Sequence, residues 1–266
     1  MLVASLLTRH HKGRYVAGAL QACGIAVMED DRWDTDQLGS FCGQQAREQS
    51  APATAALKAI LAADLSGTEL GLGSEGSFGG GPVPGILPWQ QELLALYNAN
   101  TGQIITGRAQ GPAPLSATAV ADIQSLQQLF ERYPGQGWML RSGESVHKGL
   151  LDTEAVLRVL PESTAASGYV WPITLEPDWR AMMSPLRGVR IREAAANLAA
   201  RLTSFCQACG TADFWHDHAE TGLPCRDCGA PTSRVRLTKA RCRCGYESVN
   251  ERADWADPYY CEYCNP

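Results

Sequence analysis

The stretch from Gly71 to Gly81 reads GLGSEGSFGGG, and the fold prediction starts from it. It follows a short apolar run, and its glycines lack the Cβ that restricts other residues, so the backbone can bend sharply there. We interpret it as a strand that ends in a glycine-rich loop carrying Ser74, Glu75 and Ser77. Open α/β sheets bind ligands at the carboxyl ends of their strands, so this loop is a candidate site. A hairpin or a mobile connection is the simpler alternative.

The turn after the first predicted strand has the composition of an anion-binding site. Leu2–Leu7 is apolar enough for a buried strand, and apolar residues recur at helical spacing from Val16. The turn between them contains Thr8, His10, Lys12 and further cations beside the free amides of a helix N-terminus. These groups suit phosphate, although a basic turn exposed to water would have the same composition.

The elements predicted before the candidate loop alternate between strand and helix. A second strand is expected at Gly24–Met28 and a helix at about Pro52–Ala63. Between them, Asp34 and Asp36 are close enough in sequence to share a metal ion, yet Asp-Thr-Asp is also common in turns and at helix N-caps. This alternation favours an α/β fold with a parallel or mixed sheet and covering helices.

The later part of this predicted domain adds a hairpin and three helices. Two apolar runs flank a polar turn that ends at Gly102, which predicts an antiparallel hairpin extending the sheet. Helices are expected over about 117–132, 152–160 and 189–202. Near the last helix, Arg180 and Arg187 are candidates for binding an anionic ligand, because a guanidinium fork matches phosphate or carboxylate oxygens. Pairing with surface acids is the more common role of such arginines.

Eight of the ten cysteines lie beyond residue 205 in four close pairs, which are Cys206/Cys209, Cys225/Cys228, Cys242/Cys244 and Cys261/Cys264. In a reducing compartment, thiols at these spacings bind metal far more often than they form disulfides. A shell of four thiolates is closed, so we expect two structural Zn²⁺ ions. We expect sequential pairing, with the first two pairs in one site and the last two in the other. A cross-braced arrangement is the alternative.

The fold prediction is therefore an α/β domain over residues 1–200 and a small double zinc ribbon over 201–266. Basic residues between 234 and 243 and several aromatic rings in the ribbon are the features that single-stranded nucleic acid needs. Aromatic residues are, however, the usual core of so small a module. A nucleic acid or a partner protein is thus a candidate partner of the ribbon.

Composition and charge restrict the class of protein. The formal net charge of -5 gives no reason to expect a nucleic-acid-binding surface over the whole chain, so any basic patch must be local. The apolar run at Leu2–Leu7 is followed at once by basic residues, and it is too short for a signal peptide or a membrane span. We expect a cytoplasmic protein that has no contact with membranes.

Taken together, these motifs resemble a bacterial family of unknown function. The resemblance rests on Thr8-Arg9-His10-His11-Lys12, residues 34–41, residues 72–79, Arg180-Ala181-Met182 and the paired cysteines. The family supplies no established activity.

A more remote resemblance is to the house-cleaning nucleoside triphosphate pyrophosphatases of the inosine and xanthosine triphosphatase kind. It rests on Thr-x-x-x-Lys after the first strand and Gly-x-Glu-Gly after a later one. It implies that Thr8 and Lys12 contact phosphates and that Glu75 holds Mg²⁺.

This chain departs from both patterns at several positions. Arg9 and His10 stand where the pyrophosphatases usually have an asparagine. Gln44 stands where the family of unknown function tends to have an acid, and glycines replace a Pro-His pair after Phe78-Gly79. Loss of an acid near the predicted metal implies a member that could bind its ligand without turning it over.

Two hypotheses follow. In the first, Mg²⁺ bridges Glu75, Asp36 and the phosphates of a nucleotide, and Lys12 neutralises charge while a metal-activated water attacks phosphorus. In the second, the protein is a noncatalytic adaptor whose α/β domain senses a phosphorylated ligand and whose ribbon binds nucleic acid or protein. The first requires Thr8, Lys12 and Glu75 on one concave wall.

Overall fold

The structure is a computed structural model, and it describes residues 1–33, 35–38, 49–82, 86–143, 145–165 and 171–266. Asp34 and residues 39–48, which include Gln44, lie outside the described residues, and so does the side chain of Asp36. The chain divides into two compact units, Met1–Ala199 and Ala200–Pro266. None of the described helices is both long enough and apolar enough to cross a bilayer.

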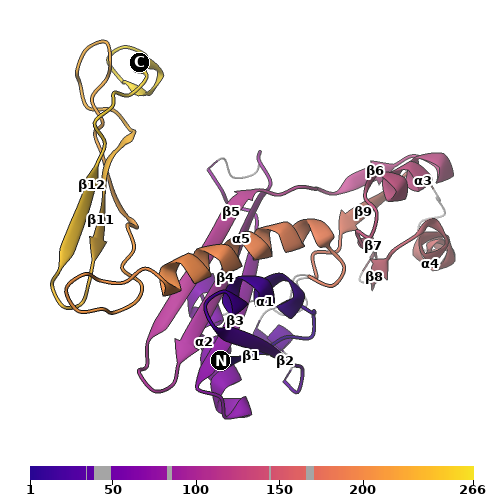
Figure 1. The fold of residues 1–266 in the computed structure, drawn as a ribbon. Coiled ribbons are helices and arrows are strands. Elements are labelled where there is room, and N and C mark those ends of the chain that lie inside the picture. Colours follow the sequence, from indigo (N-terminus) through magenta and orange to yellow (C-terminus); the bar gives the residue numbers. More distant parts are fainter. Residues whose placement is uncertain (34, 39–48, 83–85, 144, 166–170) are drawn as a thin grey trace. The chain divides into compact units, whose positions relative to one another are not determined.

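The first unit is built on a five-stranded mixed sheet with the strand order β2-β1-β3-β4-β5 (Figure 1). Its strands are β1 (Leu2–Leu7), β2 (Ile25–Asp30), β3 (Leu70–Phe78), β4 (Trp89–Asn98) and β5 (Ile104–Pro112). β1 pairs in parallel with both β2 and β3, and β4 and β5 continue the sheet in antiparallel fashion. The predicted mixed sheet and its added hairpin are therefore confirmed.

Helices cover both faces of this sheet. α2 (Ala51–Ser66) packs on one face, where its alanines cluster with Leu93 and Ala95 of β4. α5 (Pro185–Leu202) packs on the other, next to Gly107 of β5. α1 (Gly13–Gln21) lies against α5, because Gly188 leaves room for the ring of Tyr15. A short 3-10 helix, η1 (Thr35–Leu38), lies between β2 and α2.

The glycine-rich stretch is a strand up to Phe78, which corrects the prediction that Ser74, Glu75 and Ser77 lie in a loop. Residues 70–78 form β3 and pair with β4 along their whole length. A Cβ on Gly71 or Gly73 would overlap backbone atoms of α2. These glycines therefore let the helix lie directly on the strand, and the left-handed turn begins only at Gly79, whose φ is 107°.

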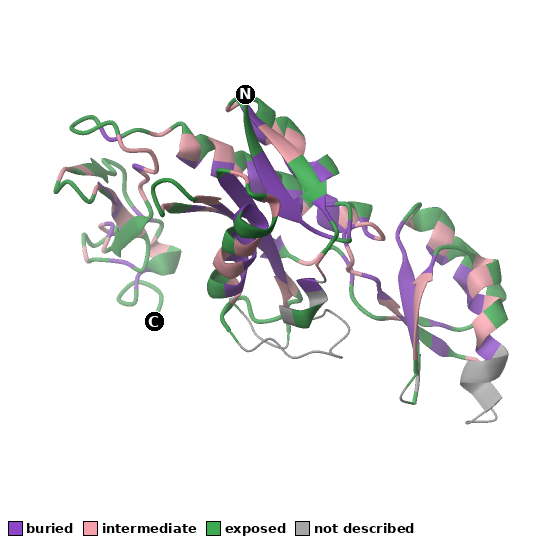
Figure 2. Ribbon diagram, turned by 90° about the horizontal axis from the view of Figure 1, so that it is seen from below, coloured by how far each residue is buried: buried purple, intermediate pink, exposed green. Residues whose placement is uncertain are grey.

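A second sheet lies between β5 and α5 in the sequence, with the strand order β6-β9-β7-β8. It comprises β6 (Thr118–Val120), β7 (Trp138–Ser142), β8 (Ser145–Leu150) and β9 (Ile173–Pro177), with helices α3 (Ile123–Arg132) and α4 (Thr153–Ala165). The helix predicted from residue 117 begins only at residue 123, because Thr118–Val120 pairs with β9 and Asp122 caps the helix. The central strands β1, β3 and β4 of the first sheet are largely buried, whereas β2, β5 and β8 are mostly exposed or half-buried (Figure 2).

The second unit is a ribbon of three antiparallel strands, β10 (His218–Thr221), β11 (Val235–Arg241) and β12 (Glu247–Glu251). A short 3-10 helix, η2 (Pro258–Tyr260), precedes the last cysteine pair. Most ribbon residues are exposed or half-buried (Figure 2). A unit with so few buried side chains needs a further source of stability, such as bound metal.

The close contact between β3 and α2 can be tested with one methyl group. Gly73→Ala would place a Cβ against the carbonyl oxygen of Ala55 and the amide nitrogen of Ala59, and neither can move without displacing the helix. We expect urea unfolding to show that the free energy of unfolding falls by about 3 kcal/mol. The control is Gly18→Ala on the exposed side of α1, where nothing lies within 4 Å of the added group. The control should be neutral or stabilising by about 0.5–1 kcal/mol, and equal losses in both variants would contradict the packing argument.

Candidate functional site

The amine of Lys12 lies at the carboxyl end of the five-stranded sheet. β1 stops at Leu7, whereas its neighbour β3 continues to Phe78, so one edge of β3 is left without a strand beside it. The turn after β1 covers this edge, and Lys12 Nζ donates a hydrogen bond to Ser74 Oγ at 3.2 Å. Both residues are more than nine-tenths buried.

Glu75 is the next residue on β3, and its carboxylate belongs to an ion pair with α2. Successive side chains of a strand point to opposite faces, so Ser74 and Glu75 diverge. Lys58 Nζ lies 2.6 Å from Glu75 Oε2, and each side chain is only 6% exposed. Glu75 still raises the pKa of Lys12, so the two groups lie within electrostatic range of each other.

A second buried ion pair joins β4 to α5. Arg187 Nε and Nη2 donate to Glu92 Oε1 and Oε2 at 2.6 and 3.0 Å, and the two side chains are 0% and 1% exposed. Gln90 donates a further hydrogen bond to Glu92, and Arg187 Nη1 donates to the carbonyl of Trp179. Gly76 makes this possible, because a Cβ there would overlap the guanidinium group and both carboxylate oxygens.

Arg180 forms the third ion pair of the region. Its guanidinium group contacts Asp178, with Nη2 2.6 Å from Oδ2, and Asp178 is 1% exposed. Asp178 also accepts the backbone N–H of Gly149 at 3.0 Å. Arg180 and Arg187, the two predicted anion-binding arginines, therefore contact carboxylates of this chain. The alternative interpretation placed such acids at the surface, whereas Asp178 and Glu92 are buried.

These contacts leave the cluster with an excess of positive charge. Lys58, Arg180 and Arg187 each have a carboxylate partner, but Lys12 has none within salt-bridge distance among the described residues. Burial, then the charges of Arg187 and Lys58, lower the pKa of Lys12 to about 7, against the opposing effect of Glu75 and Glu92. The Lys12 amine therefore changes protonation near neutral pH.

His10 and Thr8 lie on the same turn as Lys12. The hydroxyl of Thr8 accepts the backbone N–H of His10 at 3.1 Å, and both residues are buried. Burial and the charges of Lys12, Arg187 and Arg180 lower the pKa of His10 to about 3. His10 is therefore neutral at physiological pH, because burial and, after it, the neighbouring cations disfavour its protonation.

The N-terminus of α1 is not the open anion site that the sequence suggested. Glu29 Oε1 accepts the backbone N–H of Gly13 at 2.5 Å, so a carboxylate of β2 already occupies that position. Beside it, an open cavity of about 720 Å³ is lined by Thr8, Arg9, His11, Glu29, Asp31 and Arg32. The amide of Gly13 is therefore not available to an anion.

Several predicted residues meet in this cluster, and others do not. The predicted residues that lie in the cluster or next to it are Thr8, His10, Lys12, Ser74, Glu75, Arg180 and Arg187. Ser77 is half-buried further along β3, and Asp36 lies in η1 with no described side chain. Sequence reasoning missed Lys58, Glu92 and Asp178. Lys58 interrupts an alanine-rich helix and Glu92 precedes an apolar run, so each carried a weak signal of a buried ion pair.

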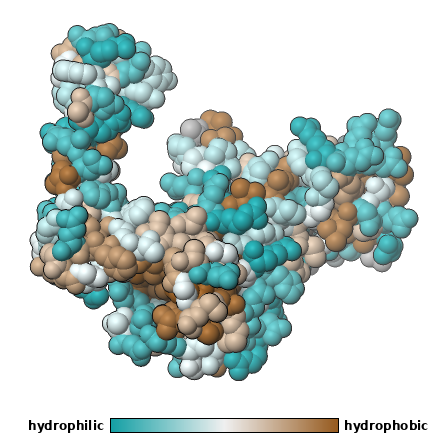
Figure 3. Space-filling model, in the orientation of Figure 1, coloured by the Kyte–Doolittle hydropathy of each residue, from teal (hydrophilic) through white to brown (hydrophobic). Residues whose placement is uncertain are grey.

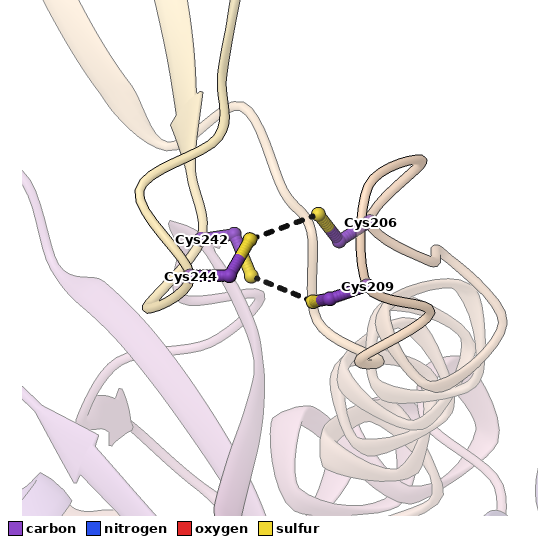
Figure 4. A group of neighbouring side chains, drawn as sticks. All are labelled: Cys206, Cys209, Cys242 and Cys244. Atoms are coloured by element: carbon purple, nitrogen blue, oxygen red, sulfur yellow. Dashed lines mark hydrogen bonds between the residues drawn. The ribbon is translucent and has the colours of Figure 1, made fainter.

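The eight ribbon cysteines form two tetrads, and their pairing corrects the sequential arrangement predicted above. Cys206 and Cys209 lie with Cys242 and Cys244, as Figure 4 shows. The other tetrad consists of Cys225, Cys228, Cys261 and Cys264. The first pair thus joins the third and the second joins the fourth, which is the cross-braced alternative.

The strand order explains this pairing. β10 leads from the first cysteine pair to the second, β11 returns to the third, and β12 leads out to the fourth. Because neighbouring strands are antiparallel, alternate pairs arrive at the same end of the ribbon. The lengths of the segments between the pairs are compatible with either arrangement, so spacing alone could not decide between them.

Each tetrad has the dimensions of a metal site. The contacts within the tetrads are 3.7 Å for Cys206–Cys244, 3.5 Å for Cys209–Cys242, 3.9 Å for Cys225–Cys264 and 3.5 Å for Cys228–Cys261. A tetrahedral ion with Zn–S bonds of about 2.3 Å requires sulfurs about 3.8 Å apart. A disulfide would need about 2.05 Å. Both tetrads can therefore hold a metal ion.

The predicted basic strip of the ribbon is largely neutralised across the strands of its sheet. Arg236 lies 3.5 Å from Glu251, and Arg241 lies 2.9 Å from Glu247. Lys239 pairs with Glu220. These pairs reduce the positive potential that a nucleic acid would need.

The depressed pKa of Lys12 predicts a specific dependence of stability on pH. Between about pH 7 and 10.5 the unfolded chain holds a proton that the folded chain has lost, so folding becomes more favourable as pH rises. We expect stability to rise by up to about 1.4 kcal/mol per pH unit in this window, and Lys12→Met to abolish that rise. Lys239→Met, at a surface ion pair, is the control. A constant difference between wild type and Lys12→Met from pH 6 to 10 would contradict the depressed pKa.

The cross-braced pairing predicts how cysteine substitutions combine. Cys206→Ser with Cys244→Ser disrupts one tetrad and should leave about one bound metal ion per chain. Cys206→Ser with Cys225→Ser disrupts both tetrads and should leave none. Metal analysis of the purified variants distinguishes the arrangements, because sequential pairing would give the opposite pattern for these two double variants.

Comparison with known proteins places the chain in a family. A search among curated proteins and a search among solved structures each found no match. A family model described as a domain of unknown function, DUF6671, matches residues 58–266, a range that includes β3 and all eight ribbon cysteines but not the turn with Lys12. The match covers well over half of the chain and confirms the resemblance to a family of unknown function. The chain therefore belongs to the DUF6671 family.

Proposed function

We propose that the first unit binds a phosphorylated small molecule, a nucleotide among the candidates, through the amine of Lys12. The supporting observation is that Lys12 is a buried cation without a salt-bridge partner among the described residues, whereas each neighbouring cation has one. A buried charge is costly unless it is paired. A bound anion would supply the missing partner.

The surroundings favour a phosphate over a singly charged anion. At Lys12 the charges of Arg187 and Lys58 outweigh those of Glu75 and Glu92, so the net potential there is positive. A multiply charged group gains more from such a potential. Ser74 already contacts the amine and can donate its hydroxyl proton to a phosphate oxygen.

The same contacts favour binding over metal-dependent hydrolysis. Glu75, the proposed ligand of Mg²⁺, is held 2.6 Å from Lys58, and Glu92 is held by Arg187 at two oxygens. Coordination of Mg²⁺ by either carboxylate would require it to leave a buried cation without a partner, which is unfavourable by about 3–5 kcal/mol. Binding without turnover therefore demands less rearrangement of this cluster.

For the ribbon, we infer that the ion in both tetrads is Zn²⁺ and that its role is structural. Four sulfur ligands suit zinc, and they leave no open position for water or substrate. Binding of the ions would supply the stability that the small number of buried side chains does not.

Calorimetry with pyrophosphate and with nucleoside triphosphates tests the proposed ligand class. We expect binding at pH 6.5, where Lys12 is largely protonated, and a loss of affinity of about 10- to 100-fold in Lys12→Met, the range for one charge-assisted hydrogen bond. Lys239→Met makes the same change in the ribbon and should bind like wild type. Equal affinities for wild type and Lys12→Met, or no binding by wild type, would refute the proposal.

A parallel assay of phosphate and pyrophosphate release with Mg²⁺ separates binding from turnover. We expect no release by wild type. Release that Glu75→Gln abolishes would instead establish the hydrolase hypothesis and the catalytic role of Glu75.

A further inference from the structure

The end of the ribbon that holds the second cysteine tetrad carries four exposed or partly exposed aromatic side chains. We call Trp255, Tyr259, Tyr260 and Tyr263 the aromatic tip, and their exposed fractions are 60%, 71%, 38% and 79%. Each of the four lies beside the tetrad of Cys225, Cys228, Cys261 and Cys264, either as a near neighbour in the sequence or through backbone contacts. A module this small normally buries such rings.

At the other end of the ribbon, two aromatic residues contribute to a small core, although Phe205 there is 57% exposed. Phe214 is buried and packs with Cys206 and Ala240, and Tyr246 packs against this cluster with its ring 5.5 Å from that of Phe214. The buried hydrophobic side chains around the second tetrad are those of Leu223, Cys225, Ala256 and Cys261, and the rings of the aromatic tip are not among them. Tyr259 and Tyr260 contact each other edge to face at 5.2 Å, and Tyr259 is otherwise largely open to solvent.

The backbone beneath the aromatic tip is well fixed by hydrogen bonds. Asp257 accepts the N–H of Tyr259 at 2.9 Å, and the side chain of Asn265 donates to the carbonyl of Tyr259 at 3.0 Å. The N–H of Arg226 donates to the carbonyl of Ala256 at 3.0 Å, which ties the second cysteine pair to the segment before η2. Rings on a fixed backbone lose little further entropy when a partner binds.

The charges around these rings indicate what kind of partner fits. The charges come from two segments, residues 224–233 and 252–266. These segments contain two arginines, Arg226 and Arg252, and four acidic residues, which are Asp227, Asp254, Asp257 and Glu262. Each arginine pairs with its neighbouring aspartate. Arg234 lies over the ring of Tyr260, 4.5 Å from its centroid, and its charge still leaves carboxylates in excess. The surface in Figure 3 is mostly hydrophilic at this end of the ribbon.

We propose that the aromatic tip is a docking surface for a basic peptide segment of a partner protein, rich in arginine or lysine. Cations of such a segment can lie over the exposed faces of Tyr259 and Tyr263 while Glu262, which has no ion pair among the described residues of the ribbon, attracts them. The contact between Arg234 and Tyr260 is an example of this geometry within the chain. A nucleic acid fits less well, because its phosphates would meet the excess of carboxylates.

Fluorescence anisotropy with defined probes tests this surface on the full-length, metal-loaded protein. The probes are a labelled 12-residue peptide of Arg, Lys, Gly and Ser, a peptide with Glu in place of the basic residues, and a 12-nucleotide oligothymidylate. We expect the basic peptide to bind most tightly and to lose affinity with added salt. Tyr259→Ala with Tyr263→Ala should weaken this binding on the order of ten-fold, and Glu262→Gln should weaken it less.

The matched control is Phe205→Ala, which removes an aromatic side chain of 57% exposure beside the first tetrad and should leave the affinity unchanged. Unchanged metal content will show that the ribbon variants are folded. The proposal is overturned if the basic peptide does not bind, if the tyrosine variant binds it like wild type, or if Phe205→Ala weakens binding equally. Tighter, tyrosine-dependent binding of the oligothymidylate would instead assign the tip to nucleic acid.

Discussion

The buried ion pair between Arg187 and Glu92 is the constraint on which the first unit depends. Two charges without solvent contact are stable only when their hydrogen bonds are satisfied, and here Gln90 and the carbonyl of Trp179 complete the set. The pair joins α5 to β4, and through Trp179 it also holds the segment that follows the second sheet. After burial, Arg187 is among the charges that lower the pKa of Lys12 and His10, so this structural contact also contributes to the electrostatics of the proposed ligand site.

Much of the fold could be predicted because its signals are local. Alternating strands and helices, the polar turn at Gly102 and the paired cysteines each identify an element or a site type without reference to distant residues. The glycines of β3 were misread because a residue without a Cβ permits a bend and close helix contact alike, and only the position of α2 decides between them. The second sheet escaped prediction because β6 is three residues long and depends on pairing with β9. Cysteine pairing depends on strand order in the same way.

The candidate site shows the same division between local and distant information. The turn with Lys12 and the strand with Ser74 were recognisable as polar groups at strand ends, and their meeting follows from the parallel pairing of β1 and β3. Lys58 and Glu92 were not recognisable as partners, because they lie far from Glu75 and Arg187 in the sequence. Asp178 precedes Arg180 by only two residues, and what could not be predicted there is its burial. The two units are chemically distinct in this account. The first gathers buried charge around one amine, and the second holds two thiolate tetrads and presents exposed rings.

The central claim is that a phosphorylated ligand supplies the partner of the buried Lys12 amine, which has no salt bridge to any residue that the structure describes. The chain contains only four lysines, at positions 12, 58, 148 and 239, so NMR of lysine labelled with ¹³C at Cε can follow each amine through a pH titration. The account predicts that one signal, lost in Lys12→Met, titrates near pH 7 in the free protein and shifts to a pKa above 9 when pyrophosphate saturates the site. A Lys12 signal that titrates near 10.5 in the free protein, or one that pyrophosphate leaves unchanged, would contradict it.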